Sequence, residues 1–97
     1  MTAAEALRIL RQGNDAFLAG SSQPPLMDRA DRLRLAEGQH PFAAYVTCSD
    51  SRVPPELLFG RGLGDLFIVR NAGNTLDVTA LGSLEFAVGV LKVPLIV

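Results

Sequence analysis

The sequence predicts an α/β fold with three layers, in which helices flank a parallel β-sheet and an N-terminal helical arm precedes it. Two observations support this fold class. Short, nearly continuous apolar runs alternate with stretches of helical periodicity, the pattern of parallel strands joined by helical crossovers. Polar side chains directly follow two of these runs, and ligands bind at the carboxyl ends of the strands in such sheets.

Residues 1–37 are predicted to form the helical arm. Thr2 and Glu5 have the spacing of a capping box, in which a hydroxyl and a carboxylate satisfy free backbone N–H groups at a helix start. Apolar residues recur at helical spacing through the first nineteen positions, and Gly20 is a suitable terminator. Residues 28–37 indicate a second, highly charged helix, whose charges are typical of a solvated face.

Residues 38–97 are predicted to form the α/β domain. Three apolar runs have the composition of strands buried on both faces. The sequence ends within the third run, so no polar cluster follows it and the sheet is expected to be incomplete. The predicted strands are residues 42–47, 66–69 and 93–97.

Two helical connections are expected between these strands. Pro54 and Pro55 favour the start of one short helical turn, because proline suits the first position of a helix. Asp77 or Thr79 can cap a longer helix with one apolar stripe. The stripe consists of Leu81, Leu84, Val88 and Leu91.

Composition excludes several classes of protein. Nine Lys and Arg against ten Asp and Glu give a net charge of -1, so no basic stripe is available for nucleic acid. No charge-free run reaches the ~18–20 apolar residues of a membrane span. Charged residues occupy the place where a secretory signal needs its apolar stretch. The single cysteine cannot form an internal disulfide, and we expect a cytoplasmic protein.

The second of the two polar clusters is residues 71–74, and the first contains Cys48, Asp50 and Arg52. In an extended segment, Cys48 and Asp50 leave the backbone on the same side, and a thiolate with a carboxylate is half of a zinc site. Arg52 can instead bind the Asp50 carboxylate through two hydrogen bonds. From spacing alone, a metal site and a purely structural arrangement both remain open.

Other interpretations of these residues are weaker. A phosphatase-type loop needs an arginine six positions after its cysteine, whereas Arg52 follows Cys48 by four. A redox or nucleophilic role for the thiol is also weaker. The chain has no second cysteine to resolve a disulfide, and the nearby Asp50 carboxylate opposes ionisation of the thiol. The alternating glycines of residues 60–64 lack the spacing and the lysine of phosphate-binding loops, so they indicate turns. The only histidine, His40, is separated from Cys48 by eight strand residues, roughly 25 Å, and is expected at the surface.

A longer set of residues resembles the β-class carbonic anhydrases. The resemblance covers roughly residues 38–97 and is specific because the order and the spacing of many residues agree. The segments that carry it are CSDSRVPPE at residues 48–56, DLFIVRNAGN at 65–74, GSLEFA at 82–87, the run at 93–97 and Gln39.

The resemblance implies zinc-dependent, reversible hydration of carbon dioxide to bicarbonate. Cys48 would be a zinc ligand, and the metal would lower the pKa of its bound water to ~7, so that hydroxide attacks carbon dioxide. Asp50 would either ligate zinc in a closed form or pair with Arg52 and accept a proton. Gln39, Phe67 and Ala72 match positions of the family's substrate pocket, with Gln39 and Phe67 contributed across a homodimer interface or within a higher oligomer.

The sequence departs from the family in one respect. The family's other two zinc ligands come from a His-x-x-Cys motif after the strand that residues 93–97 begin, and the 97 residues end before it. We therefore expect a truncated carbonic anhydrase that binds zinc weakly and has negligible activity alone. The alternatives are an inert fragment or interaction module of this fold, and a related hydrolase of carbonyl sulfide or carbon disulfide.

Overall fold

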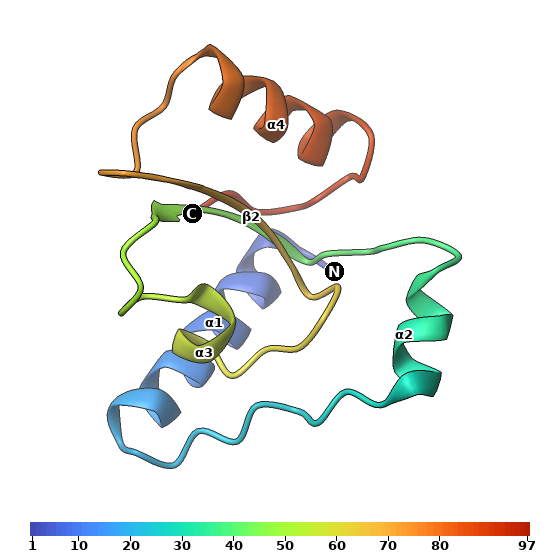
Figure 1. Ribbon diagram of the computed structural model, residues 1–97, viewed down its shortest axis with the longest axis vertical. Coiled ribbons are helices and arrows are strands. Elements are labelled where there is room, and N and C mark those ends of the chain that lie inside the picture. The colour runs from blue at the N-terminus through green and yellow to red at the C-terminus, as the bar shows by residue number, and fades with distance from the viewer.

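Four helices and two strands form the structure, a computed structural model that describes residues 1–97 (Figure 1). The elements follow one another as α1 (Ala3–Leu18), α2 (Arg29–Leu35), β1 (Ala43–Cys48), α3 (Pro55–Leu58), β2 (Leu66–Asn71) and α4 (Val78–Gly89). No helix is long and apolar enough to cross a membrane.

The two strands are parallel, as predicted, and end at the same level. The register pairs Ala43 with Leu66 and Cys48 with Asn71. Both polar clusters of the sequence are therefore placed at one edge of the sheet, because the carboxyl ends of parallel strands lie together.

The third predicted strand, residues 93–97, forms only an isolated parallel bridge, between Ile96 and Ala44 on the free side of β1. Two backbone features limit its length. Pro94 has no N–H to donate to a ladder. The N–H of Val93 donates to the carbonyl of Ala87 in α4 at 3.0 Å, so it is not available to β1. Pairing begins only at Leu95, whose carbonyl accepts from the Ala44 N–H at 2.8 Å.

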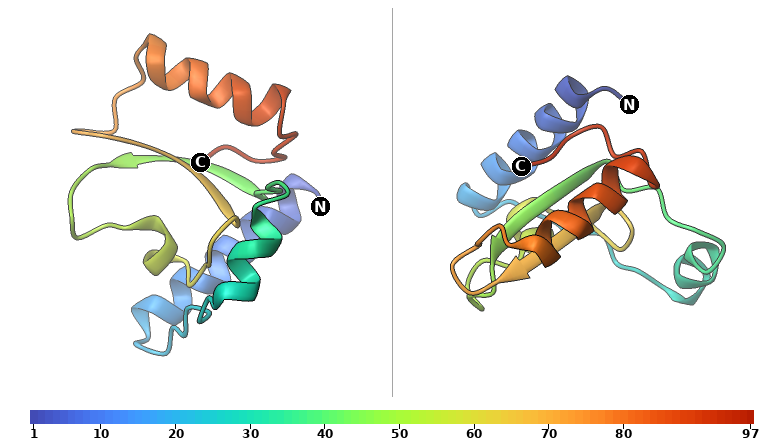
Figure 2. Two further views of the ribbon diagram at one scale, coloured as in Figure 1. Left: turned by 45° about the vertical axis from the view of Figure 1, so that its right-hand side comes forward. Right: turned by 90° about the horizontal axis from the view of Figure 1, so that it is seen from above.

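Helices lie on both sides of the sheet, which confirms the predicted layers. In Figure 1 and Figure 2, α4 covers one face, while α1 and α3 lie on the other. The cluster beneath α4 is built of small or medium side chains, which allow the helix to approach the sheet closely. Its buried members are Ala44, Leu84, Ala87 and Val93.

The inward face of α4 differs from the predicted stripe. Ala80, Leu84 and Ala87 are buried, whereas Leu81 is 47% exposed and Val88 is 45% exposed. The helix is apolar on nearly every side, so its hydrophobic pattern cannot identify which face meets the sheet. Close packing against the sheet instead places Ala80 and Ala87 on the inward face.

The predicted helix ends are found where local signals place them. The Thr2 hydroxyl accepts from the Glu5 N–H at 3.1 Å, and the Glu5 carboxylate accepts from the Thr2 N–H at 2.7 Å. Of the two candidate caps for α4, Asp77 is used, and its carboxylate accepts from the Ala80 N–H at 2.8 Å. Gly20, with φ of +72°, follows the end of α1.

Candidate functional site

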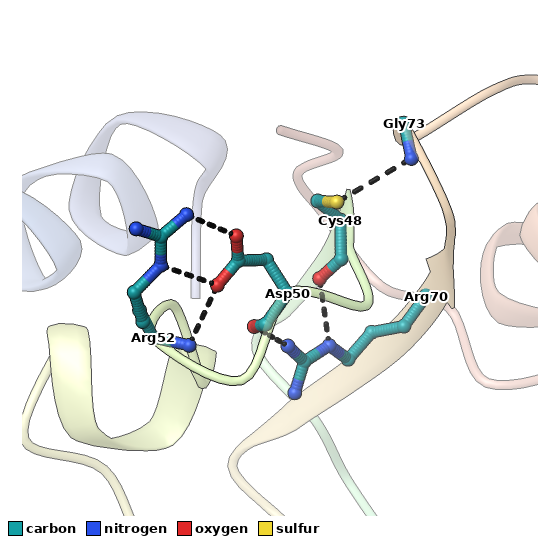
Figure 3. Close-up of polar contacts among 5 residues, drawn as sticks. All are labelled: Cys48, Asp50, Arg52, Arg70 and Gly73. Atoms are coloured by element: carbon teal, nitrogen blue, oxygen red, sulfur yellow. Dashed lines mark hydrogen bonds and ion pairs between the residues drawn. The ribbon is translucent and has the colours of Figure 1, made fainter.

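The carboxyl ends of β1 and β2 bring the two polar clusters into contact. The Gly73 N–H donates to Cys48 Sγ at 3.3 Å (Figure 3). Gly73 has φ of +79°, a conformation that glycine adopts without strain, and this turn aims its N–H at the sulfur. The Asn71 side chain secures the same turn, because its Oδ1 accepts from the Thr75 N–H at 2.6 Å and its Nδ2 donates to the Thr75 carbonyl at 2.8 Å.

Asp50 and Arg52 form a two-pronged ion pair beside the thiol (Figure 3). Arg52 Nε donates to Asp50 Oδ1 at 3.0 Å, and Nη2 donates to Oδ2 at 2.7 Å. The backbone N–H of Arg52 also donates to Oδ1 at 2.8 Å. These bonds, chiefly those from the Arg52 side chain, hold the pKa of Asp50 below its usual value. The same pairing raises the pKa of Arg52.

The thiol of Cys48 is partly exposed, and its surroundings lower its pKa. The hydrogen bond from the Gly73 N–H is the main cause that lowers the pKa of Cys48, and the Asp50 N–H adds to it. The negative charge of Asp50 acts in the opposite direction. A thiolate is the form in which cysteine binds a metal or acts as a nucleophile.

Arg70, which sequence reasoning did not single out, also belongs to this site. Its Nε donates to the Cys48 carbonyl at 2.9 Å, and its Nη2 donates to the Asp50 carbonyl at 2.7 Å (Figure 3). Arg70 is the strand partner of Thr47, one position before Cys48. A basic residue at the end of a strand that neighbours a candidate site was the available signal.

The predicted pocket residues lie in three different places. Ala72 is exposed in the turn between Asn71 and Gly73, close to the thiol. Gln39 is exposed and precedes β1, so it lies at the opposite end of that strand from Cys48. Phe67 is half-buried on β2, with its ring 6.1 Å from that of Phe86.

Gln39 and Phe67 are therefore not brought to Cys48 within one chain. Phe67 pairs with Ala44, four residues before the end of β1, or about 13 Å along the strand. His40 is exposed at the start of β1, as expected.

The described residues fit part of a zinc site. Cys48 is a suitable donor because its thiol is partly exposed and has a lowered pKa, whereas both Asp50 oxygens are bound by Arg52. No group of three or more His, Cys, Asp or Glu side chains lies close enough together to hold a metal ion. A catalytic zinc has three protein ligands, so these residues would need further donors.

Comparison with known proteins identifies the family. A family model described as "Carbonic anhydrase" matches residues 43–97, which include both polar clusters. Carbonic anhydrase 2 of Mycobacterium tuberculosis is 50% identical over 92 residues, and the match covers 95% of this chain. The chain belongs to the carbonic anhydrase family.

Solved structures place this carbonic anhydrase chain in the β class. The β-carbonic anhydrase CcaA matches 96% of the chain with a TM-score of 0.67 and 32% identity. One of two tetrameric β-carbonic anhydrases from Sordaria macrospora matches 95% with a TM-score of 0.67 and 29% identity. The chain spans 44% of the length of the M. tuberculosis protein, 43% of the CcaA chain and 47% of the Sordaria chain.

Proposed function

We propose that this site serves the reversible hydration of carbon dioxide to bicarbonate with zinc as cofactor. One observation carries the proposal: in a chain of this family, the Cys48 thiol has a lowered pKa and lies near an Asp50 carboxylate that Arg52 holds. Cys48 would hold the metal. When bound, zinc supplies an activated water molecule at neutral pH.

The role of Asp50 follows from its contacts. Arg52 holds both carboxylate oxygens, and this pairing keeps Asp50 ionised and directs it away from metal ligation. An ionised carboxylate beside the thiol can accept a proton at Oδ1 or Oδ2 during the reaction. If Arg52 released it, Asp50 would become available as a second donor from this chain, which is the closed form of the site.

The substrate pocket would be completed by a second copy of the chain. Ala72 lies beside Cys48, whereas Gln39 and Phe67 lie too far along the strands to reach the thiol of their own chain. The apolar groove of Leu81, Val88 and Ile96 supports association. We propose a homodimer or higher homo-oligomer of the α/β domain of residues 38–97, with residues 1–37 as an arm.

A chimera tests the proposed reaction. In this chimera, residues 1–97 would replace the aligned part of M. tuberculosis carbonic anhydrase 2, and the rest of that protein would be kept unchanged. We expect about one zinc per chain and rapid hydration of carbon dioxide by stopped-flow assay. Cys48→Ser should remove most of the zinc, whereas Ser49→Ala, beside it, should not. Unchanged zinc affinity in Cys48→Ser would show that Cys48 is not a ligand.

The same assay separates the other candidates. The absence of a three-donor group within the described residues favours an inert fragment or interaction module for the 97 residues alone. Stoichiometric zinc binding by the 97-residue chain, with a rise in its melting temperature, would contradict that view. Turnover of carbonyl sulfide or carbon disulfide by the chimera in preference to carbon dioxide would indicate the related hydrolases.

We also propose that the protein is cytoplasmic, because a reducing compartment suits the free Cys48 thiol.

A further inference from the structure

We propose that Arg70 is a positioning residue, whose guanidinium fixes the backbone of the Cys48–Asp50 segment and thereby places both functional side chains. The proposal deepens the proposed function. It rests on that function in one respect, namely that Cys48 and Asp50 are the side chains that must be positioned. Arg70 touches neither side chain with its hydrogen bonds. It acts through their backbone carbonyls.

The segment needs such support because it leaves the sheet at Cys48. The last ladder contact runs from the Ser49 N–H to the Asn71 carbonyl at 2.9 Å. Beyond it, the Asp50 carbonyl has no strand partner. This carbonyl instead accepts from Arg70 Nη2 at 2.7 Å and from the Val53 N–H at 3.2 Å. Arg70 therefore ties β2 to the turn that carries the Asp50–Arg52 pair.

The geometry requires the fork of an arginine. Figure 3 shows the Arg70 side chain reaching from β2 to the two carbonyls, with Nε at Cys48 and Nη2 at Asp50. The guanidinium presents these donors in one rigid plane, so the two carbonyls are held at a fixed separation. A lysine ammonium is a single point on a flexible stem and cannot impose that separation.

The expected consequence is local. Without the fork, the turn of residues 50–53 should open more often, while β1 and β2 keep their ladder. The Arg52 N–H and Nε–H, which both donate to Asp50 Oδ1, then lose protection from solvent exchange. When the two Arg70 hydrogen bonds to this turn are removed, exchange of the Arg52 and Val53 amides should become about 5–10-fold faster.

The experiment is NMR hydrogen exchange on the 97-residue chain, with the Arg52 Nε–H resonance as a marker of the ion pair. Arg70→Gln should speed exchange at Arg52 and Val53 and move the Nε–H resonance toward that of a free arginine. Arg70→Lys should restore part of the protection. Arg61→Gln is the matched control, because Arg61 Nε also donates to a backbone carbonyl, that of Gly60, in the loop before β2.

If Arg70→Gln folds, three results would overturn the proposal. The first is unchanged exchange at Arg52 and Val53 in Arg70→Gln. The second is an equal increase in Arg61→Gln, since that would indicate general loosening. The third is faster exchange accompanied by a matching fall in the urea midpoint of the whole chain. If Arg70→Gln does not fold, Arg70→Lys decides, and wild-type protection in that variant would contradict the need for a fork. Turnover is not measured, so failure of the proposed reaction is tested separately.

Discussion

Arg52 binds both carboxylate oxygens of Asp50 and also donates its backbone N–H to one of them, so a single residue supplies three hydrogen bonds to that carboxylate. The two residues are separated by one position, and the geometry is therefore local. It leaves the Cys48 thiol beside a carboxylate that is ionised and held by another group.

Removing the Arg52 side chain should raise the pKa of Asp50. The folded-state pKa is depressed, so the pair's contribution to stability is present above the ordinary carboxyl pKa and is lost as pH falls through the depressed value. In Arg52→Gln, the carboxyl carbon resonance of Asp50 should titrate at higher pH. Arg29→Gln, an exposed arginine of α2, is the control and should leave the titration unmoved. An identical Asp50 midpoint in Arg52→Gln would show that its side chain is not the cause.

The Cys48 thiol should ionise at lower pH than an ordinary cysteine, and Asp50→Asn should lower its midpoint further. The substitution removes the carboxylate charge that opposes ionisation, while the Gly73 and Asp50 backbone N–H groups remain. The rate of alkylation by iodoacetamide against pH measures this midpoint, because the thiolate is the reactive form. Glu85→Gln, on α4, should not move it. A higher alkylation midpoint in Asp50→Asn would show that the Asp50 charge does not oppose ionisation of Cys48.

Local signals were sufficient to predict much of the fold from the sequence. The Thr2–Glu5 capping box and the Asp77 cap involve residues three apart, so their geometry depends little on the rest of the chain. The Asp50–Arg52 pair is local in the same way, and spacing alone predicted that Arg52 could bind the Asp50 carboxylate with two hydrogen bonds.

The features that the sequence did not predict depend on distant partners. The carbonyls that Arg70 binds lie 20 and 22 residues earlier in the chain. Residues 93–97 pair with β1 only from Leu95 onward, in part because the Val93 N–H donates to Ala87 of α4, a contact that composition cannot reveal. The face of α4 that meets the sheet likewise depends on a distant partner, because Leu84 and Ala87 pack with Ala44 of β1.

The groove between α4 and the C-terminal segment of residues 93–97 should mediate association between chains. Leu81, Val88 and Ile96 are each 45–47% exposed and line one apolar groove. Val88→Glu should shift the chain toward the monomer in sedimentation velocity, because a buried, unpaired carboxylate is costly at an interface. Val78→Glu is the matched control on the same helix, at a position that is 86% exposed. Association that is equally strong in Val88→Glu would place the interface elsewhere.

The contact between α1 and α3 should make Gly13 intolerant of any side chain. A Cβ at Gly13 would overlap the Phe59 carbonyl oxygen, a backbone atom that cannot turn aside, and the neighbouring Asn14 side chain already binds the Leu58 carbonyl at 3.3 Å. Gly13→Ala should therefore force the helices apart and lower the free energy of unfolding by about 1–3 kcal/mol, measured by urea denaturation. Gly82→Ala is the matched control, because nothing lies within 4 Å of its Cβ, and alanine should raise stability by about 0.5–1 kcal/mol there. Since alanine favours a helix at both positions, a stabilised Gly13→Ala would mean that α1 does not pack on α3 as closely as the structure shows.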